Sequence, residues 1–226
     1  MKKIVILSIG ALFPFFASIL YFNILDGSEA AKTVYLIAKI AILIYPVLAL
    51  YILRKKLPQL KDIFAFDFKE LMLGVKWGIV LFILGLLSTK IPQIAAIIDI
   101  ASPHIINKIS GFGVANYYII FAFIISFIHS MLEEYYWRWF LFGELKKIIF
   151  LPLAYFLAGL AFSLHHFIVL NFYFPLGVAA IFTFIVMIGG VLFSYLYNRK
   201  ENIWGAWAMH VFADLVIMYV GWSVIN

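Results

Sequence analysis

The sequence predicts an all-α fold, a polytopic transmembrane helical bundle of about seven spans. Of its 226 residues, 66% are hydrophobic and 12% are charged, whereas roughly a quarter of the residues in a soluble domain are charged. The apolar residues gather in runs of about 20, the length that a helix needs to cross a bilayer. These observations exclude a soluble globular protein and predict a multi-pass integral protein of the cell membrane.

Seven apolar runs follow one another along the chain. The first begins directly after Lys2 and Lys3, as a signal peptide would, but it exceeds the ~7–15 apolar residues of such a peptide and is predicted to be an uncleaved span. The fifth has Pro152 near its start, where the first turn of a helix tolerates proline. The predicted spans are residues 4–25, 33–53, 71–88, 117–142, 150–169, 175–197 and 203–224.

The segment 89–116 does not fit this pattern. It contains Pro92 and Pro103, and its apolar run at 94–101 is too short to cross a bilayer alone. We expect an interfacial or re-entrant piece here, with an eighth crossing as the alternative. Seven spans put the basic loops on one side, which predicts a cytoplasmic N-terminus and an external C-terminus. The basic sites are Lys2 and Lys3, the loop 54–69, Lys146 and Lys147, and Arg199 and Lys200.

No internal repeat or long linker divides the chain, so residues 1–226 are predicted to form a single integral membrane domain. The net charge of +6 comes from loops between apolar runs, where lipid headgroups explain it better than nucleic acid does. We therefore expect the lipid bilayer as a partner and no nucleic acid. The absence of cysteine excludes disulfides, thiolate nucleophiles and zinc sites built on sulfur.

The segment 133–138, Glu-Glu-Tyr-Tyr-Trp-Arg, places two carboxylates and a guanidinium within an apolar run. Ionisable groups at membrane depth are costly and are a functional hypothesis by default. Glu134 lies four residues before Arg138, on the same helix face, so these two are predicted to pair. Glu133 is rotated by about 100° and is predicted to lack a cationic partner, which makes it the candidate general base. The alternative is a structural ion-pair cluster.

Two further pairs of polar and aromatic residues have the spacing of a helix turn. Phe162 precedes His166 by four residues, so its ring can pack against the imidazole. Asp214 follows His210 by four and can accept a hydrogen bond from one ring nitrogen, aiming the other into a site. From the depth of each residue in its span, Glu133, His166, His210 and Asp214 are expected to share one layer near the membrane middle.

The remaining histidines near these motifs, His129 and His165, are interpreted as packing residues. His129 lies one helix turn before Glu133, so a supporting role for it stays open.

The motifs Glu-Glu-x-x-x-Arg at 133–138, Phe-x-x-x-His at 162–166 and His-x-x-x-Asp at 210–214 resemble those of the CAAX-protease and bacteriocin-processing (CPBP, or Abi) family of glutamic-type intramembrane endopeptidases. The resemblance covers about 117–224, the candidate catalytic core. It implies that Glu133 and His166 activate a water and that His210 and Asp214 stabilise the oxyanion of the tetrahedral intermediate. It also implies structural roles for Glu134 and Arg138.

Two features depart from that family's pattern. Its members most often have asparagine at the position of Asp214, and its CAAX-processing members usually have an eighth span. A carboxylate cannot donate a hydrogen bond as an amide does, so Asp214 is expected to act through His210.

The resulting functional prediction is an endopeptidase that cleaves a membrane-embedded or lipidated protein or peptide. CAAX-like C-termini, leader peptides and C-terminal anchor segments all fit. No cofactor is expected. One alternative is a zinc-dependent protease using Glu133, His166 and His210, with His165 in reserve, although no HExxH motif is present. The other is a non-enzymatic membrane partner that confers bacteriocin resistance.

Overall fold

The chain is helical in a computed structural model, which describes residues 1–55, 61 and 63–226. No strand occurs among these residues. Seven of the described helical segments are long and apolar enough to cross a membrane, which confirms the predicted fold class. These are Lys2–Ile24, Glu29–Arg54, Phe68–Ser88, Ala115–Leu145, Leu151–Tyr173, Leu176–Lys200 and Trp204–Ile225.

The segment after the third span forms helix α4, Pro92–Gly111, which is longer than its apolar run at 94–101 suggested. Pro92 lies in its first turn and Pro103 within it, so neither proline prevents the helix. Helix α4 is not among the seven segments with the length and hydropathy of a span. The orientation predicted from loop charge stays a prediction. In the basic loop 54–69, residues 56–60 and 62 lie outside the described residues.

The helices group into two compact units that alternate along the chain, the first comprising Met1–Phe66 and Leu132–Ile203, the second Asp67–Met131 and Trp204–Asn226. Whether they form the single domain predicted from the sequence stays a prediction.

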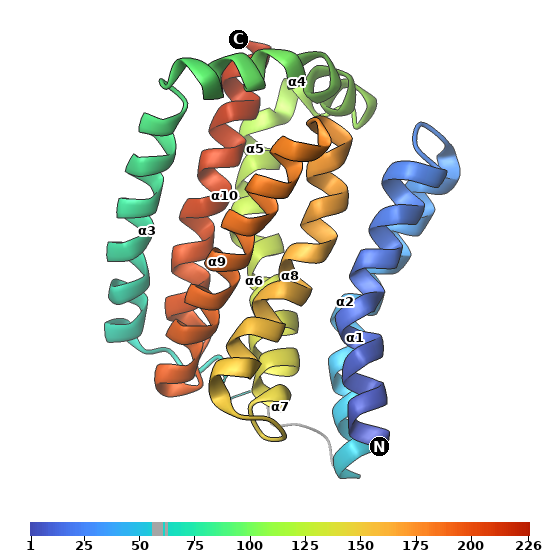
Figure 1. The fold of residues 1–226 in the computed structure, drawn as a ribbon, viewed down its shortest axis with the longest axis vertical. Coiled ribbons are helices and arrows are strands. Elements are labelled where there is room, and N and C mark those ends of the chain that lie inside the picture. The colour runs from blue at the N-terminus through green and yellow to red at the C-terminus, as the bar shows by residue number, and fades with distance from the viewer. Residues whose placement is uncertain (56–60, 62) are drawn as a thin grey trace. The chain divides into compact units, whose positions relative to one another are not determined.

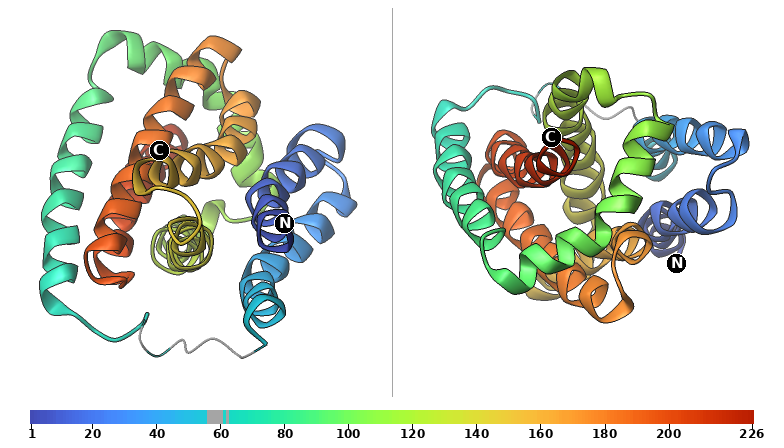
Figure 2. Two further views of the ribbon diagram at one scale, coloured as in Figure 1. Left: turned by 60° about the horizontal axis from the view of Figure 1, so that its bottom comes forward. Right: turned by 90° about the horizontal axis from the view of Figure 1, so that it is seen from above.

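The first unit contains two helix pairs. Helices α1 (Lys2–Ile19) and α2 (Glu29–Arg54) run side by side, connected through the short π-helix η1, Leu20–Ile24 (Figures 1 and 2). Ser28 is the N-cap of α2. Its side chain accepts a hydrogen bond from the Ala31 amide, a donor in the first turn of the helix. Helices α8 (Leu151–Tyr173) and α9 (Leu176–Lys200) form the other pair, with Pro152 in the first turn of α8 as predicted.

The second unit is built on the contact between α3 (Phe68–Ser88) and α10 (Trp204–Ile225) (Figure 1). A Cβ atom added at Gly74 would clash with the Gly205 carbonyl oxygen, so glycine allows this close approach. Helix α4 runs across the end of α10 in Figure 1. The remaining elements are η2 (Ala115–Tyr117), α5 (Tyr118–Phe123) and η3 (Ile124–His129).

Burial is inverted relative to a soluble protein. Large apolar side chains such as Ile119, Leu84 and Ile181 are more than half exposed, whereas Glu134 and Arg138 are almost completely buried. Lipid tails solvate apolar faces but not charges. This distribution agrees with a multi-pass membrane protein in which these two ionisable groups are buried among the helices.

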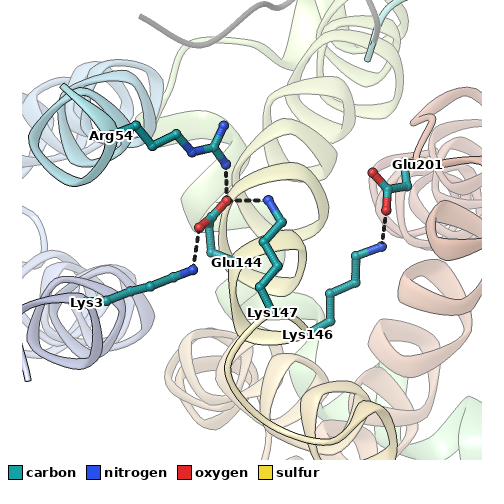
Figure 3. Close-up of polar contacts among 6 residues, drawn as sticks. All are labelled: Lys3, Arg54, Glu144, Lys146, Lys147 and Glu201. Atoms are coloured by element: carbon teal, nitrogen blue, oxygen red, sulfur yellow. Dashed lines mark hydrogen bonds and ion pairs between the residues drawn. The ribbon is translucent and has the colours of Figure 1, made fainter. Parts of the chain in front are cut away.

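In the first unit, near the N-terminus of the chain, three basic side chains surround one buried carboxylate (Figure 3). Glu144, in the short helix α7 (Gly143–Leu145), contacts Arg54, lies 2.8 Å from Lys3 Nζ and lies 2.7 Å from Lys147 Nζ. Its side chain is 4% exposed. The cluster ties α1, α2 and α7 together, a structural role that loop charge alone did not predict.

The span that carries the acidic motif departs from a regular α-helix. It contains π-helical segments at η3 and at η4, Tyr135–Phe142, on either side of α6, Ser130–Glu134. In the second unit, the Phe127 carbonyl of η3 accepts a hydrogen bond of 3.0 Å from the Trp207 indole of α10, which connects this irregular segment to α10. Single π-helical turns are frequent at functional sites.

Candidate active site

Two tyrosines anchor the motif-bearing helix within the first unit. Tyr136 donates a hydrogen bond of 2.6 Å to the Gly10 carbonyl of α1, and Tyr135 donates one of 3.1 Å to the Leu43 carbonyl of α2. Both donors lie in η4, directly after the two glutamates. The N-terminal helices, which matched no motif in the sequence, therefore position the acidic motif.

The predicted pairing of Glu134 with Arg138 is present. Arg138 Nε lies 3.2 Å from Glu134 Oε2, and the two side chains are 1% and 0% exposed. The guanidinium carbon also lies 4.3 Å from the ring centroid of Phe162 and 5.0 Å from that of Phe193. Two aromatic faces and one carboxylate thus surround the cation, which is a structural arrangement.

Glu133 is 6% exposed, but the prediction that it lacks a cationic partner is wrong. Its Oε1 lies 3.4 Å from His165 Nε2, and Arg138 also interacts with it electrostatically. The interpretation of His165 as a packing residue needs the same correction. Its ring does stack on Trp137, with centroids 5.2 Å apart and planes 6° from parallel, and this stacking holds its nitrogen at the carboxylate.

His166 lies beside Phe162 as predicted, with ring centroids 4.6 Å apart. Its Nδ1 lies 2.9 Å from the Phe162 carbonyl oxygen. A carbonyl only accepts, so Nδ1 carries the hydrogen, and the lone pair of the neutral ring is on Nε2. One oxygen of Glu133 and one nitrogen each of His165 and His166 lie within 4.8 Å of one another. The structure therefore brings Glu133 and His166 together.

His210 and Asp214 form the second predicted pair, on α10 in the second unit. His210 Nε2 lies 3.6 Å from Asp214 Oδ1, within ion-pair range but longer than a hydrogen bond. Their side chains are 4% and 15% exposed. The expectation that this pair shares one layer with Glu133 and His166 stays a prediction.

The Glu133 and His166 pair has the groups needed to activate a water. A carboxylate can accept a proton, while an imidazole lone pair orients the same water. With His165, the pair also offers three ligands of the types that zinc accepts. His165 was predicted to be a packing residue, and no role was predicted for Trp137. The signal in the sequence that points to His165 is the histidine doublet at 165–166.

Comparison with known proteins bears on the same segment. Residues 115–216 match the family model described as type II CAAX prenyl endopeptidase Rce1-like, and all three motifs lie inside this match. No curated protein and no solved structure matches the chain. The match confirms the family resemblance carried by the motifs: residues 115–216 are similar to the Rce1-like CAAX prenyl endopeptidases.

Proposed function

We propose that this protein is a glutamic-type intramembrane endopeptidase of the cell membrane. Its substrate would be a membrane-embedded or lipidated protein or peptide. The observation that carries the proposal is the buried Glu133 carboxylate close to His166, within a segment that matches an endopeptidase family. A buried carboxylate beside an imidazole suits hydrolysis by an activated water.

In the proposed reaction, Glu133 removes a proton from a water whose second hydrogen is held by His166 Nε2. The water oxygen bonds to the carbonyl carbon of the scissile peptide, and the carbonyl electron pair moves onto its oxygen. When the tetrahedral intermediate collapses, the C–N bond breaks and Glu133 returns the proton to the leaving nitrogen. No covalent enzyme intermediate and no added cofactor are needed.

The family resemblance assigns the stabilisation of the developing oxyanion to His210. Donors placed at a developing negative charge are typically worth about 10²–10³ in rate. Asp214 would act through His210 by orienting its ring, which its position 3.6 Å from Nε2 favours. Asp214→Asn keeps the shape and should retain substantial activity, whereas Asp214→Leu should lose most of it. An inactive asparagine variant would instead indicate direct carboxylate chemistry at this position.

The substrate class with the strongest support is a CAAX-like C-terminus, because the matching family is described as one of CAAX prenyl endopeptidases. Leader peptides and C-terminal anchor segments are the other candidates. The test compares peptides released by membranes that contain the wild-type protein, Glu133→Gln or the matched control Glu29→Gln, whose side chain is 88% exposed. Prenylated and unprenylated CAAX peptides are supplied in parallel.

Glu133→Gln should lower the rate of release by about 10²–10⁴, the typical contribution of a general base. Glu29→Gln should leave it unchanged. Full activity of Glu133→Gln at equal protein abundance would refute the proposed mechanism. If the wild type releases no peptide yet Glu133→Gln keeps the protein's biological effect, the non-enzymatic alternative is correct.

A further inference from the structure

Three side chains at the motif converge more closely than their positions on the helices require. His165 and His166 are adjacent on α8, where successive side chains point about 100° apart, yet their ring centroids are 4.0 Å apart. Glu133 meets them from α6, and the three ligand atoms lie within 4.8 Å of one another. All three residues belong to the first unit.

The two imidazoles are held by different neighbours. His165 stacks on Trp137, and its Nε2 lies 3.4 Å from Glu133 Oε1. Ligands bound tetrahedrally to zinc at about 2.0–2.1 Å lie about 3.3 Å from each other, so this pair already has the required separation. His166 donates from Nδ1 to the Phe162 carbonyl, the type of contact that orients a metal-ligating imidazole.

The local charge and the donor set also favour a cation. Glu133, Glu134 and Arg138 together carry a formal charge of −1, and all three are buried. Two imidazoles and one carboxylate form a donor set that zinc accepts, and three protein ligands leave a fourth position open. The separations are all within 4.8 Å, so the longest must shorten by at most about 1.5 Å for tetrahedral coordination, a distance that side-chain rotation can cover.

We propose that Glu133, His165 and His166 form a binding site for a divalent transition-metal ion of the zinc class, and that the bound ion inhibits the enzyme. The inhibition rests on the proposed function. The ion takes up the Glu133 oxygen and the His166 nitrogen that would otherwise activate the water. Metal binding and water activation are then alternative states of one site, and His165 belongs specifically to the metal-bound state.

Metal binding is tested directly on the full chain, purified in detergent and stripped of metal with a chelator. Co²⁺ serves as the spectroscopic probe, because tetrahedral coordination gives strong visible absorption bands, and Zn²⁺ is added to displace it. The absence of cysteine removes thiolates as competing ligands. We expect one Co²⁺ per chain with a tetrahedral spectrum, and displacement by one equivalent of Zn²⁺.

Two substitutions of His165 separate ligation from folding. His165→Phe keeps an aromatic ring to stack on Trp137 but removes both nitrogens, and His165→Asn replaces the imidazole with a poor zinc ligand. Each should weaken metal binding at least about 100-fold, the upper range for loss of an outer-shell partner. The control is His104→Asn, which removes a histidine of α4 that is outside the trio. Unchanged affinity in both His165 variants, or no binding by the wild type, would overturn the site.

The effect on activity is measured separately, in the peptide-release assay with chelated membranes. We expect the wild type to remain active after chelation and to lose activity as Zn²⁺ is added over the concentration range in which it binds. Loss of activity on chelation, restored by Zn²⁺, would overturn the inhibitory role. A fully active Glu133→Gln variant would refute the proposed function instead, whatever the result of the Co²⁺ titration.

Discussion

Removing one partner of the Glu134–Arg138 pair should destabilise the protein more than it impairs turnover. Glu134→Gln deletes the carboxylate charge 3.2 Å from Arg138 Nε but leaves a guanidinium that is 1% exposed. The nearest aromatic neighbours, Phe162 and Phe193, stabilise a cation only partly. Glu133 also acts on Arg138, but less strongly than Glu134 does, so the cost is that of a buried charge that has lost its closest partner.

The expected magnitude follows from that burial. Breaking a buried ion pair by removing one partner costs about 3–5 kcal/mol. With a shift of about 2–4 °C per kcal/mol for a chain of this size, Tm should fall by about 6–20 °C. Arg138→Leu should cost a similar amount, because it strands Glu134 and also loses the contact with both rings, worth about 0.5–2 kcal/mol. The double variant removes both charges and should be more stable than either single variant.

The assay is thermal unfolding of the purified variants in detergent, together with peptide release per folded molecule. Glu133→Gln provides the matched comparison, because it is the same chemical change at the adjacent residue. We expect it to lose turnover and to keep most of its stability, the reverse of Glu134→Gln. If Glu134→Gln melts with the wild type yet is inactive, or if the double variant loses the sum of the two single losses, the assigned roles are wrong.

Three further predictions concern the helix contacts, the loop charges and the topology. Gly74→Ala should destabilise the contact of α3 with α10 by about 1–3 kcal/mol, measured by thermal unfolding, whereas Gly111→Ala, with open space around its Cβ, should have no such effect. The hydrogen bond from Lys146 lowers the pKa of the Glu201 carboxyl, against partial burial, which raises it. This pair should contribute less than about 1 kcal/mol to the free energy of unfolding, because the carboxylate is exposed. The contribution is present above about pH 4.3 and is lost as pH falls through the lowered pKa. Lys146→Gln should lack this pH-dependent contribution when its unfolding is measured as a function of acid pH. A cysteine appended to the C-terminus should react with an impermeant thiol reagent from outside the cell, and labelling only after permeabilisation would contradict the predicted topology.

The spans could be predicted because hydropathy over about 20 residues reports directly on the bilayer. The predicted and observed bounds of the last span, 203–224 and Trp204–Ile225, differ by one residue at each end. Helix α4 was harder to predict because its apolar run at 94–101 is shorter than the helix that contains it. Length and hydropathy identify candidate spans, but they do not predict how far a helix with a shorter apolar run will extend.

The contact of Glu134 with Arg138 could be predicted because it depends only on helix spacing, and that spacing brings the two side chains together here. The contact of Glu133 with His165 depends on a second helix and on Trp137, and no local pattern predicts it. The same applies to Glu144. Loop charge identified its partners Lys3, Arg54 and Lys147 as basic loop residues, while their convergence on one buried carboxylate requires three elements that are distant in the sequence.

The π-helical segment η4 changes the helix geometry directly after the two glutamates. In an α-helix, residues four apart share a face, whereas the i→i+5 hydrogen bonds of a π-helix widen each turn and shift that register. Trp137, within η4, lies flat against His165. A regular helix through 135–142 would rotate Trp137 relative to Glu133, so the irregular turn itself helps to hold the histidine ring at the carboxylate.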